Sequence, residues 1–243
     1  MLDGRWLVSQ RWENLLFAHW PVDPERIRRL LPAGVEPDVR DGQAWIALVP
    51  FVMVGTRLPE APTWAALKPI AELNVRTYVR VGGVPAVWFL SLDASSRLFA
   101  GIGQRLFGLR YHVARMTTET VEGRVHYLSA RPGAGFAASY EPCGPPARAS
   151  EGSLEHFLVE RYRLFSERRG RLLTACVVHE PWPLQPAAAR IVLNRMAPPG
   201  IDLGGEPLLH FVRTVDALIS APAAVSAGGR RHRLIDLAAS GRA

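Results

Sequence analysis

The chain has 243 residues, of which 48% are hydrophobic, and it carries a formal net charge of +7. This length and composition predict one ligand-cavity domain over residues 1–221, followed by an Ala-, Gly- and Arg-rich tail over residues 222–243 that we expect to be partly disordered. The basic residues are arginines scattered singly, with Lys68 as the only lysine. Because no aromatic stacking platform or binding module accompanies them, the charge does not indicate a nucleic-acid partner.

The cysteines and the apolar runs indicate the cellular compartment in which the protein is expected. Cys143 and Cys176 lack the spacing of a metal site, a redox motif or a disulfide framework. Charged residues interrupt the N-terminal region where a signal peptide needs an apolar stretch. The longest apolar run, residues 44–54, is shorter than the ~20 residues that span a bilayer. We therefore expect a cytoplasmic protein with no membrane partner, metal or cofactor. The sequence does not decide whether the protein forms a homo-oligomer.

Turn and cap signals predict the elements in chain order. Asp23 is typical of an N-cap and Pro24 of a first helical residue, so a short helix is expected over 24–31. Asp-Gly at 41–42, Gly-Gly at 82–83 and Glu-Gly at 122–123 each separate two strand-like runs. Such glycine-containing pairs are typical of two-residue hairpin turns, or close to that type, so three hairpins are expected. The turn at 122–123 places Glu119 opposite His126. Further strands are expected over 172–179, 189–196 and 208–218.

Two longer helices are expected between these strands. Leu98, Ile102 and Leu106 recur at helical spacing, which predicts a helix that is capped by Asp93 or Ser95 and ends at Gly108. Ser153 precedes an amphipathic pattern that predicts a helix reaching to about residue 170. Most of the predicted elements are strands. We therefore expect the α+β fold class, with a mainly antiparallel, barrel-like sheet and two or three helices.

The hairpin over residues 72–93 fixes a register. Counting from Gly82-Gly83 places Arg76 opposite Phe89, Asn74 opposite Ser91 and Glu72 opposite Asp93, all on one face. The other face is continuously apolar, with Trp88 among its members, and is expected to pack in the core.

The polar face of this hairpin is the first candidate site. Two carboxylates directly opposite each other repel, so Glu72 and Asp93 would need a shared proton, a cation or a nearby arginine such as Arg76, as at acid–base sites. Alternatively, Asp93 caps the following helix and Glu72 lies in solvent. The face that carries Asn74, Arg76 and Tyr78 is either solvated or, in a closed sheet, lines a cavity in which Arg76 clamps a carboxylate or phosphate.

Tyr111 and His112 form the second candidate site. As neighbours on a strand they point to opposite faces, Tyr111 with Arg115 and His112 with Ala114. His112 is either a general base or a structural histidine. Arg161 falls on the apolar stripe of the amphipathic pattern, where it needs either a structural salt bridge or a ligand.

Five segments carry a family resemblance: NVRTYV (74–79), WFLSLDA (88–94), GLRYHVARM (108–116), FLVERYRLF (157–165) and HEPWPL (179–184). Together they resemble the YqjF-like family of uncharacterised bacterial proteins. The resemblance implies a fold similar to that of acetoacetate decarboxylase, in which strands enclose a small-molecule cavity. Those decarboxylases use a lysine Schiff base, but here Tyr111 and His112 stand at the similar position, and Lys68 lies outside the motif. Imine chemistry is therefore not expected.

These observations predict a small-molecule-binding protein whose ligand is acidic or contains a carbonyl group. As an enzyme it would use lyase-like or acid–base chemistry: Arg76 would hold an anion, Tyr111 or His112 would transfer a proton, and Glu72 or Asp93 would be the partner. Further ligand contacts are expected from Asn74, Tyr78, Ser91 and Arg115. The alternatives are a non-catalytic sensor or interaction module and, more weakly, the binding of an anionic polymer through surface arginines and Arg230, Arg231 and Arg233.

Overall fold

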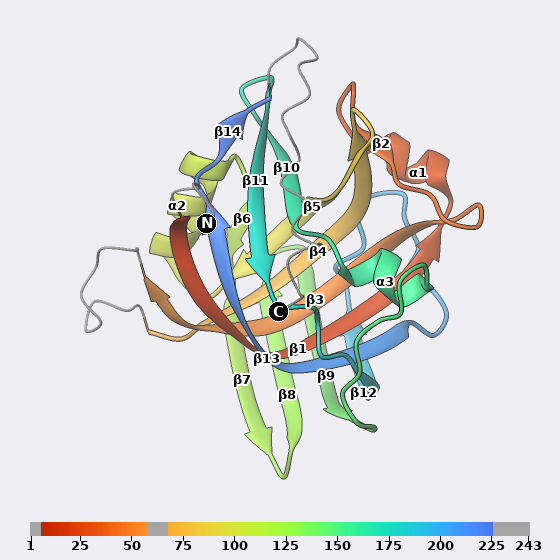
Figure 1. Ribbon diagram of the computed structural model, residues 1–243. Coiled ribbons are helices and arrows are strands. Elements are labelled where there is room, and N and C mark those ends of the chain that lie inside the picture. Colours follow the sequence, from red (N-terminus) through yellow and green to blue (C-terminus); the bar gives the residue numbers. More distant parts are fainter. Residues whose placement is uncertain (1–5, 58–67, 226–243) are drawn as a thin grey trace, which may run out of the picture.

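The structure, a computed structural model, describes residues 6–57 and 68–225. Within these ranges the chain forms three helices and a sheet of fourteen strands (Figure 1). The elements are β1 (Trp6–Val22), α1 (Pro24–Arg28), β2 (Glu36–Pro37), β3 (Ala44–Arg57), β4 (Ile70–Val81), β5 (Val84–Ala94), α2 (Arg97–Phe107), β6 (Tyr111–Val113), β7 (Arg115–Val121), β8 (Arg124–Arg131), β9 (Ala134–Pro142), α3 (Leu154–Val159), β10 (Arg163–Arg168), β11 (Arg171–His179), β12 (Gln185–Asn194), β13 (Leu208–Ser220) and β14 (Ala223–Ala224).

Seven of the strands close into a ring. Their order is β13-β1-β3-β4-β5-β10-β11, and β11 pairs back with β13 through Val177–Ile219 to His179–Ala217. From β13 the sheet continues through β12, β9, β8 and β7, which extend below the ring in Figure 1. Most pairings are antiparallel, and β5 pairs in parallel with β6 and β10. The expected α+β class, with a mainly antiparallel, barrel-like sheet and two or three helices, is confirmed.

Alternation along the strands divides the apolar side chains between two core clusters. On β1, Leu15 and Phe17 belong to a cluster inside the ring, whereas Leu16 packs in a second cluster with Tyr127 and Phe136 of the extended strands. Successive residues of a strand point to opposite faces, so one strand supplies both clusters. The ring is therefore packed on both faces, and the inner cluster surrounds the cavity described below.

The hairpin of β4 and β5 carries a β-bulge that corrects the expected register. Val81 pairs with Val84 and Arg76 with Phe89, as predicted, but the register shifts between Val75 and Arg76. Beyond the shift Asn74 lies opposite Leu92, and Glu72 lies opposite Ala94. One extra residue in β5 reverses the direction of every later side chain, so the predicted pairings of Asn74 with Ser91 and Glu72 with Asp93 are wrong. Trp88, before the bulge, is only 2% exposed, which confirms its predicted burial.

Two helices begin close to their predicted positions. Asp23 caps α1 by accepting a hydrogen bond from the Glu25 backbone N–H at 2.9 Å. The cap of α2 is Ser96 instead of Asp93 or Ser95, and Gly108, with φ of 65°, ends that helix as predicted. The predicted apolar stripe of Leu98, Ile102 and Leu106 is largely exposed, at 64%, 41% and 43%, although Ile102 also lines the cavity described below. The buried residues of α2 are Ala100, Gly103 and Phe107, and the first two are small enough to allow close approach.

The predicted helix over 153–170 is correct only in its first third. Ser153 caps α3, which ends at Val159, and the chain then extends into β10. Leu164 belongs to the inner cluster and Phe165 to the outer one, which is the alternation of a strand. Pairing with both β5 and β11 supplies hydrogen-bond partners for the backbone N–H and C=O groups of β10. These tertiary hydrogen bonds override the local helical pattern.

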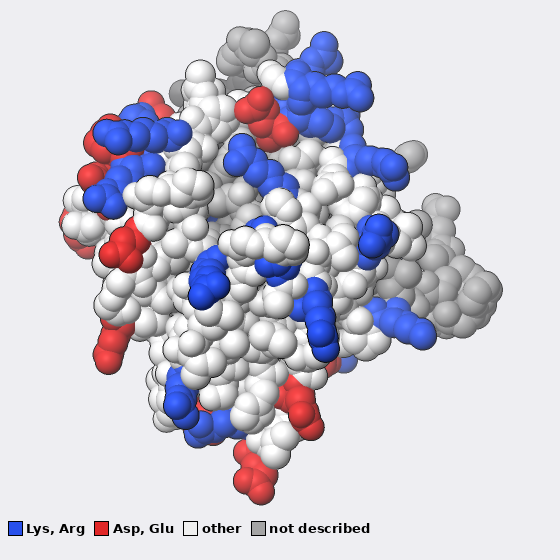
Figure 2. All heavy atoms as spheres, turned by 180° about the vertical axis from the view of Figure 1, so that it is seen from behind, with Lys and Arg blue, Asp and Glu red and all other residues white. Residues whose placement is uncertain are grey.

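The surface carries its charge in scattered form. Figure 2 shows blue side chains distributed over one face, with one group near the top and red side chains among them. Nothing in residues 6–57 and 68–225 forms a helix with the length and apolar composition needed to cross a membrane. At the far end Ala223 and Ala224 pair with β11, so the sheet extends into the expected tail. Arg230, Arg231 and Arg233 lie outside the described residues.

Candidate functional site

A cavity of about 130 Å³ lies inside the ring. Its wall comes from the ring strands together with α2, β6 and the segments flanking α3 and β11. Most lining side chains are apolar, and the polar ones are Gln10, Glu72, Asn74, Arg76, Tyr111 and Arg161. Three of these come from alternate positions of β4, so the polar face of that strand lines a cavity and is not solvated.

Arg76 is the charged group at the centre of the β4 stripe. The residue is 8% exposed, and its guanidinium carbon lies 5.2 Å from the ring centre of Phe17 and 5.6 Å from that of Tyr78. Its one side-chain hydrogen bond runs from Nη2 to the Tyr78 hydroxyl at 3.5 Å, and Nε has no partner. No carboxylate of the described residues pairs with it. Arg76 is thus a buried cation held by aromatic rings.

Tyr78 lies beside Arg76 on the same face of β4, in the inner cluster. Its side chain is fully buried and does not line the cavity, and its hydroxyl lies 2.8 Å from His19 Nε2. Burial, and secondly the charge of Arg76, lower the pKa of His19 well below its ordinary value. A neutral His19 adds no positive charge beside Arg76. Tyr78 therefore contacts Arg76 and His19 and does not line the cavity.

Arg161 also reaches the cavity, but it has a counter-ion. Its Nη1 donates to Asp38 Oδ2 at 2.7 Å, and Asp38 Oδ1 accepts from Arg80 Nε at 2.7 Å. The guanidinium carbon lies 4.4 Å from the ring centre of Phe157. This is the structural salt bridge that the sequence left as one of two alternatives.

Glu72 and Tyr111 meet at another part of the wall. The Tyr111 hydroxyl donates to Glu72 Oε2 at 2.7 Å, and Glu72 is 4% exposed. Burial raises the pKa of Glu72 to about 7, although the hydrogen bond from Tyr111 acts in the opposite direction. The Tyr111 ring packs edge-on against Phe99 and so close to Gly103 that any side chain there would clash with it. This packing holds the hydroxyl against a carboxyl group that can exchange a proton near neutral pH.

Asp93 lies outside the cavity and does not face Glu72. Its carboxylate is fully buried and accepts hydrogen bonds from Ser129 Oγ at 2.8 Å and Arg131 Nε at 2.6 Å, both on β8. The β5 bulge turns it to the outer face, where it ties β5 to β8. The prediction of a paired Glu72–Asp93 site is therefore wrong, and so is the alternative of a helix cap.

Three other predicted site residues, His112, Ser91 and Arg115, also lie outside the cavity. His112 lies beside Asp93 in the β5–β6 pairing and is exposed, so it points away from the cavity that Tyr111 lines. Ser91 lies opposite Val75, and Arg115 is exposed on β7; neither lines the cavity. The prediction that Tyr111 and His112 face opposite sides is confirmed.

Groups suited to a metal or an imine are not gathered at the cavity. In the part of the chain that the structure describes, no three His, Cys, Asp or Glu side chains cluster as a metal site requires. Lys68 is exposed and is not among the lining residues. The cavity chemistry available from these residues is anion binding and proton transfer.

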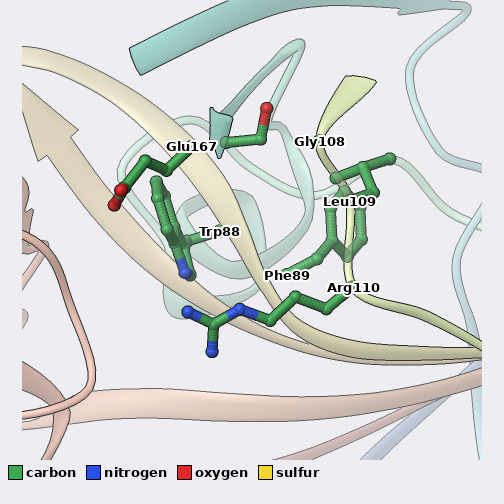
Figure 3. Close-up of a pocket in the computed structure, with 7 residues that line it drawn as sticks. Trp88, Phe89, Gly108, Leu109, Arg110 and Glu167 are labelled. Carbon is green, nitrogen blue, oxygen red and sulfur yellow. The ribbon is translucent and has the colours of Figure 1, made fainter. Parts of the chain in front are cut away.

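A second hollow, of about 120 Å³, lies where β5 meets the α2–β6 connection and β10. Figure 3 shows the Arg110 side chain extending along it towards the Trp88 ring, while the Glu167 carboxylate points away. Trp88 Nε1 is buried without a hydrogen-bond partner among the described residues. Arg110 and Glu167 are exposed, so this hollow lacks the enclosed charge of the main cavity.

Several cavity residues were not singled out in the sequence. Trp12 and Trp182 stack with their ring centres 6.0 Å apart, and Phe17 meets Trp182 edge-on at 5.1 Å. Trp12 and Phe17 belong to β1, which reads as an ordinary strand. Only the motif around Trp182 gave a local signal, as part of the family resemblance.

The comparisons with known proteins agree with this geometry. Among solved structures, an acetoacetate decarboxylase-like enzyme from Sphingomonas wittichii RW1 shares 16% identity with a TM-score of 0.64, covering 90% of this chain and 93% of that one. The enduracididine biosynthesis enzyme MppR complexed with pyruvate shares 14% identity with a TM-score of 0.64, covering 90% of each chain. Acetoacetate decarboxylase from Legionella pneumophila shares 12% identity with a TM-score of 0.62, covering 93% of this chain and 92% of that one. At these identities the likeness shows a shared fold.

The sequence comparisons identify the family of the chain. The uncharacterized protein YqjF of Bacillus subtilis strain 168 is 39% identical over 221 residues, which cover 89% of this chain and 91% of YqjF. The model of the DUF2071 family, described as an uncharacterized conserved protein, matches residues 9–216. The resemblance carried by the five motifs is thus confirmed, and the chain belongs to the DUF2071 family, together with YqjF.

Proposed function

We propose that the protein binds a small molecule with a carboxylate or carbonyl group inside the ring, with Arg76 as the anchor. The observation that carries this proposal is the buried guanidinium of Arg76, which has no carboxylate partner in the described part of the protein. A buried charge is unfavourable unless it is paired, and Arg suits two parallel hydrogen bonds to a carboxylate. Arg161, by contrast, is already neutralised by Asp38.

We propose further that Glu72 and Tyr111 form the acid–base pair if the ligand is transformed. A carboxyl group with a pKa of about 7 can both donate and accept a proton near neutral pH. The Tyr111 hydroxyl can donate to a carbonyl oxygen as charge develops there. The chemistry would be lyase-like or acid–base, without a lysine imine, because Lys68 lies away from the cavity. The cytoplasm is the proposed location, in keeping with the free thiols of Cys143 and Cys176.

A non-catalytic ligand sensor is the second candidate. The observation that favours it is the apolar character of most of the cavity wall, which suits retention of a ligand as well as its conversion. The two candidates differ in whether a bound ligand is recovered unchanged.

Binding is tested first with pyruvate and acetoacetate, the compounds named with MppR and with the decarboxylases. Mass spectrometry of molecules that co-purify under native conditions adds ligands beyond these two. Affinity is measured for the parent protein and for Arg76→Gln, with Arg213→Gln as control because Arg213 is an exposed arginine on β13. We expect Arg76→Gln to fold and to lose at least about tenfold in affinity, or roughly 1.4 kcal/mol. Equal affinity in the folded variant would remove Arg76 from the site.

Catalysis is tested by following the best ligand by nuclear magnetic resonance in the presence of the parent, Glu72→Gln and Tyr111→Phe. Conversion by the parent that both variants lose supports the enzyme. Unchanged recovery of a tightly bound ligand supports the sensor.

A further inference from the structure

The apolar cavity wall contains a large group of aromatic rings. Seven of its lining side chains are tryptophan or phenylalanine, and they come from β1, β3, β5, α2 and the segment after β11. Trp12 and Trp182 are stacked with an interplanar angle of 18°, and Phe17 meets Trp182 at 85°. Aromatic rings bury large apolar areas, so this wall favours an apolar partner.

Three of the six polar lining side chains form a strip on β4. Glu72, Asn74 and Arg76 occupy alternate positions of β4, each about 7 Å from the next along the strand. Among the described residues, two buried polar atoms of this strip have no hydrogen-bond partner, the acceptor Asn74 Oδ1 and the donor Arg76 Nε. A carboxylate can accept from Arg76 but cannot donate to Asn74 Oδ1. The rest of such a ligand must still cover the aromatic wall.

The cavity also has room for several water molecules beside its apolar wall. Its volume of about 130 Å³ corresponds to about four water molecules, at ~30 Å³ for each. Water between apolar walls lacks hydrogen-bond partners, so an apolar group that replaces it gains free energy. Pyruvate would satisfy Arg76 but leave most of the aromatic wall uncovered.

We infer that the ligand is an amphiphilic monocarboxylic acid: its carboxylate contacts Arg76, and an apolar body the size of a medium-length alkyl chain or one aryl ring fills the aromatic part of the cavity. This inference rests on the proposed function, because it keeps Arg76 as the anchor and adds the class of the remaining part of the ligand. It distinguishes the chain from a protein whose site is shaped around pyruvate alone.

Three probe compounds distinguish the contribution of the carboxylate to affinity from that of the apolar body. Pyruvate and 2-oxooctanoate share the 2-oxo acid group and differ by five methylenes, and 2-octanone has an apolar body without a carboxylate. Each methylene that becomes buried tightens binding about fourfold. By calorimetry, 2-oxooctanoate should bind at least about thirtyfold more tightly than pyruvate and than 2-octanone. In Arg76→Gln the preference for 2-oxooctanoate over 2-octanone should fall to less than about threefold.

A filling variant tests where the body lies. Val87 of β5 is buried and lines the cavity, so Val87→Phe should weaken 2-oxooctanoate at least about tenfold and pyruvate less than about threefold. Val192→Phe adds the same bulk on β12 at a residue that is 65% exposed, and it should change neither affinity. Melting curves establish that each variant folds. If Val87→Phe does not fold, the affinities of the parent for the three probes decide by themselves.

The outcomes distinguish this inference from the proposed function. Equal affinities for pyruvate and 2-oxooctanoate, both dependent on Arg76, would overturn the amphiphilic ligand and leave the anion site standing. Equal affinities for 2-oxooctanoate and 2-octanone, independent of Arg76, would overturn the proposed function and with it the carboxylate in this inference. The absence of binding by all three probes would overturn both.

Discussion

Replacing Glu72 by glutamine should remove a pH dependence from the stability of this protein. Burial raises the pKa of Glu72 from 4.5 to about 7, so between these pH values the folded protein retains a proton that the unfolded chain releases. The stability from this group is fully present below pH 4.5 and is lost as the pH rises to about 7. At ~1.4 kcal/mol per pKa unit, the free energy of unfolding falls by about 3 kcal/mol over this range.

Glutamine keeps the shape of the neutral carboxyl group but does not titrate. Relative to the parent, Glu72→Gln should therefore have similar stability near pH 4.5 and become more stable by up to about 3 kcal/mol at pH 8. Urea unfolding of both proteins at several pH values between 4.5 and 8 gives this difference, in which the other titrating groups cancel. Glu119→Gln, at an exposed residue of β7, is the control and should show no trend. A difference between Glu72→Gln and the parent that stays constant with pH would refute the reasoning.

Three further predictions follow from burial and exposure. Trp88→Ala should destabilise the protein by on the order of 3–5 kcal/mol in urea unfolding, because the residue is 2% exposed; a melting temperature within a degree or two of the parent would contradict this. Borohydride treatment with acetoacetate or pyruvate should leave Lys68 unmodified in peptide mapping, since Lys68 lies away from the cavity; a stoichiometric reduced adduct there would show that imine chemistry occurs. Asp38→Asn should destabilise by about 3–5 kcal/mol because it leaves the buried Arg161 without its carboxylate, whereas Asp216→Asn, at an exposed ion pair, should leave the melting temperature unchanged; equal effects of the two variants would contradict this.

Local chemistry was enough to predict the features that depend on a few neighbouring residues. Gly82 and Gly83 have φ values of 57° and 81°, the left-handed conformation that a primed hairpin turn requires, and the pairing near the turn followed from them. Asp23 and Ser153 capped helices because a short oxygen-bearing side chain meets the free backbone N–H groups of the first turn. Alternation from the same turn placed Arg76 on the polar face of the hairpin, and the sequence left open whether that face is solvated or lines a cavity.

Only the tertiary structure decided which groups share the site. The bulge in β5 has no local sequence signal, yet one extra residue moved Asp93 to the outer face and left Glu72 inside. Tyr111 reaches Glu72 across 39 residues because β6 pairs with β5, and residues 163–168 form a strand because both neighbours offer backbone partners. Side-chain alternation and turns follow from local sterics, whereas register shifts and strand neighbours depend on the packing of the whole ring.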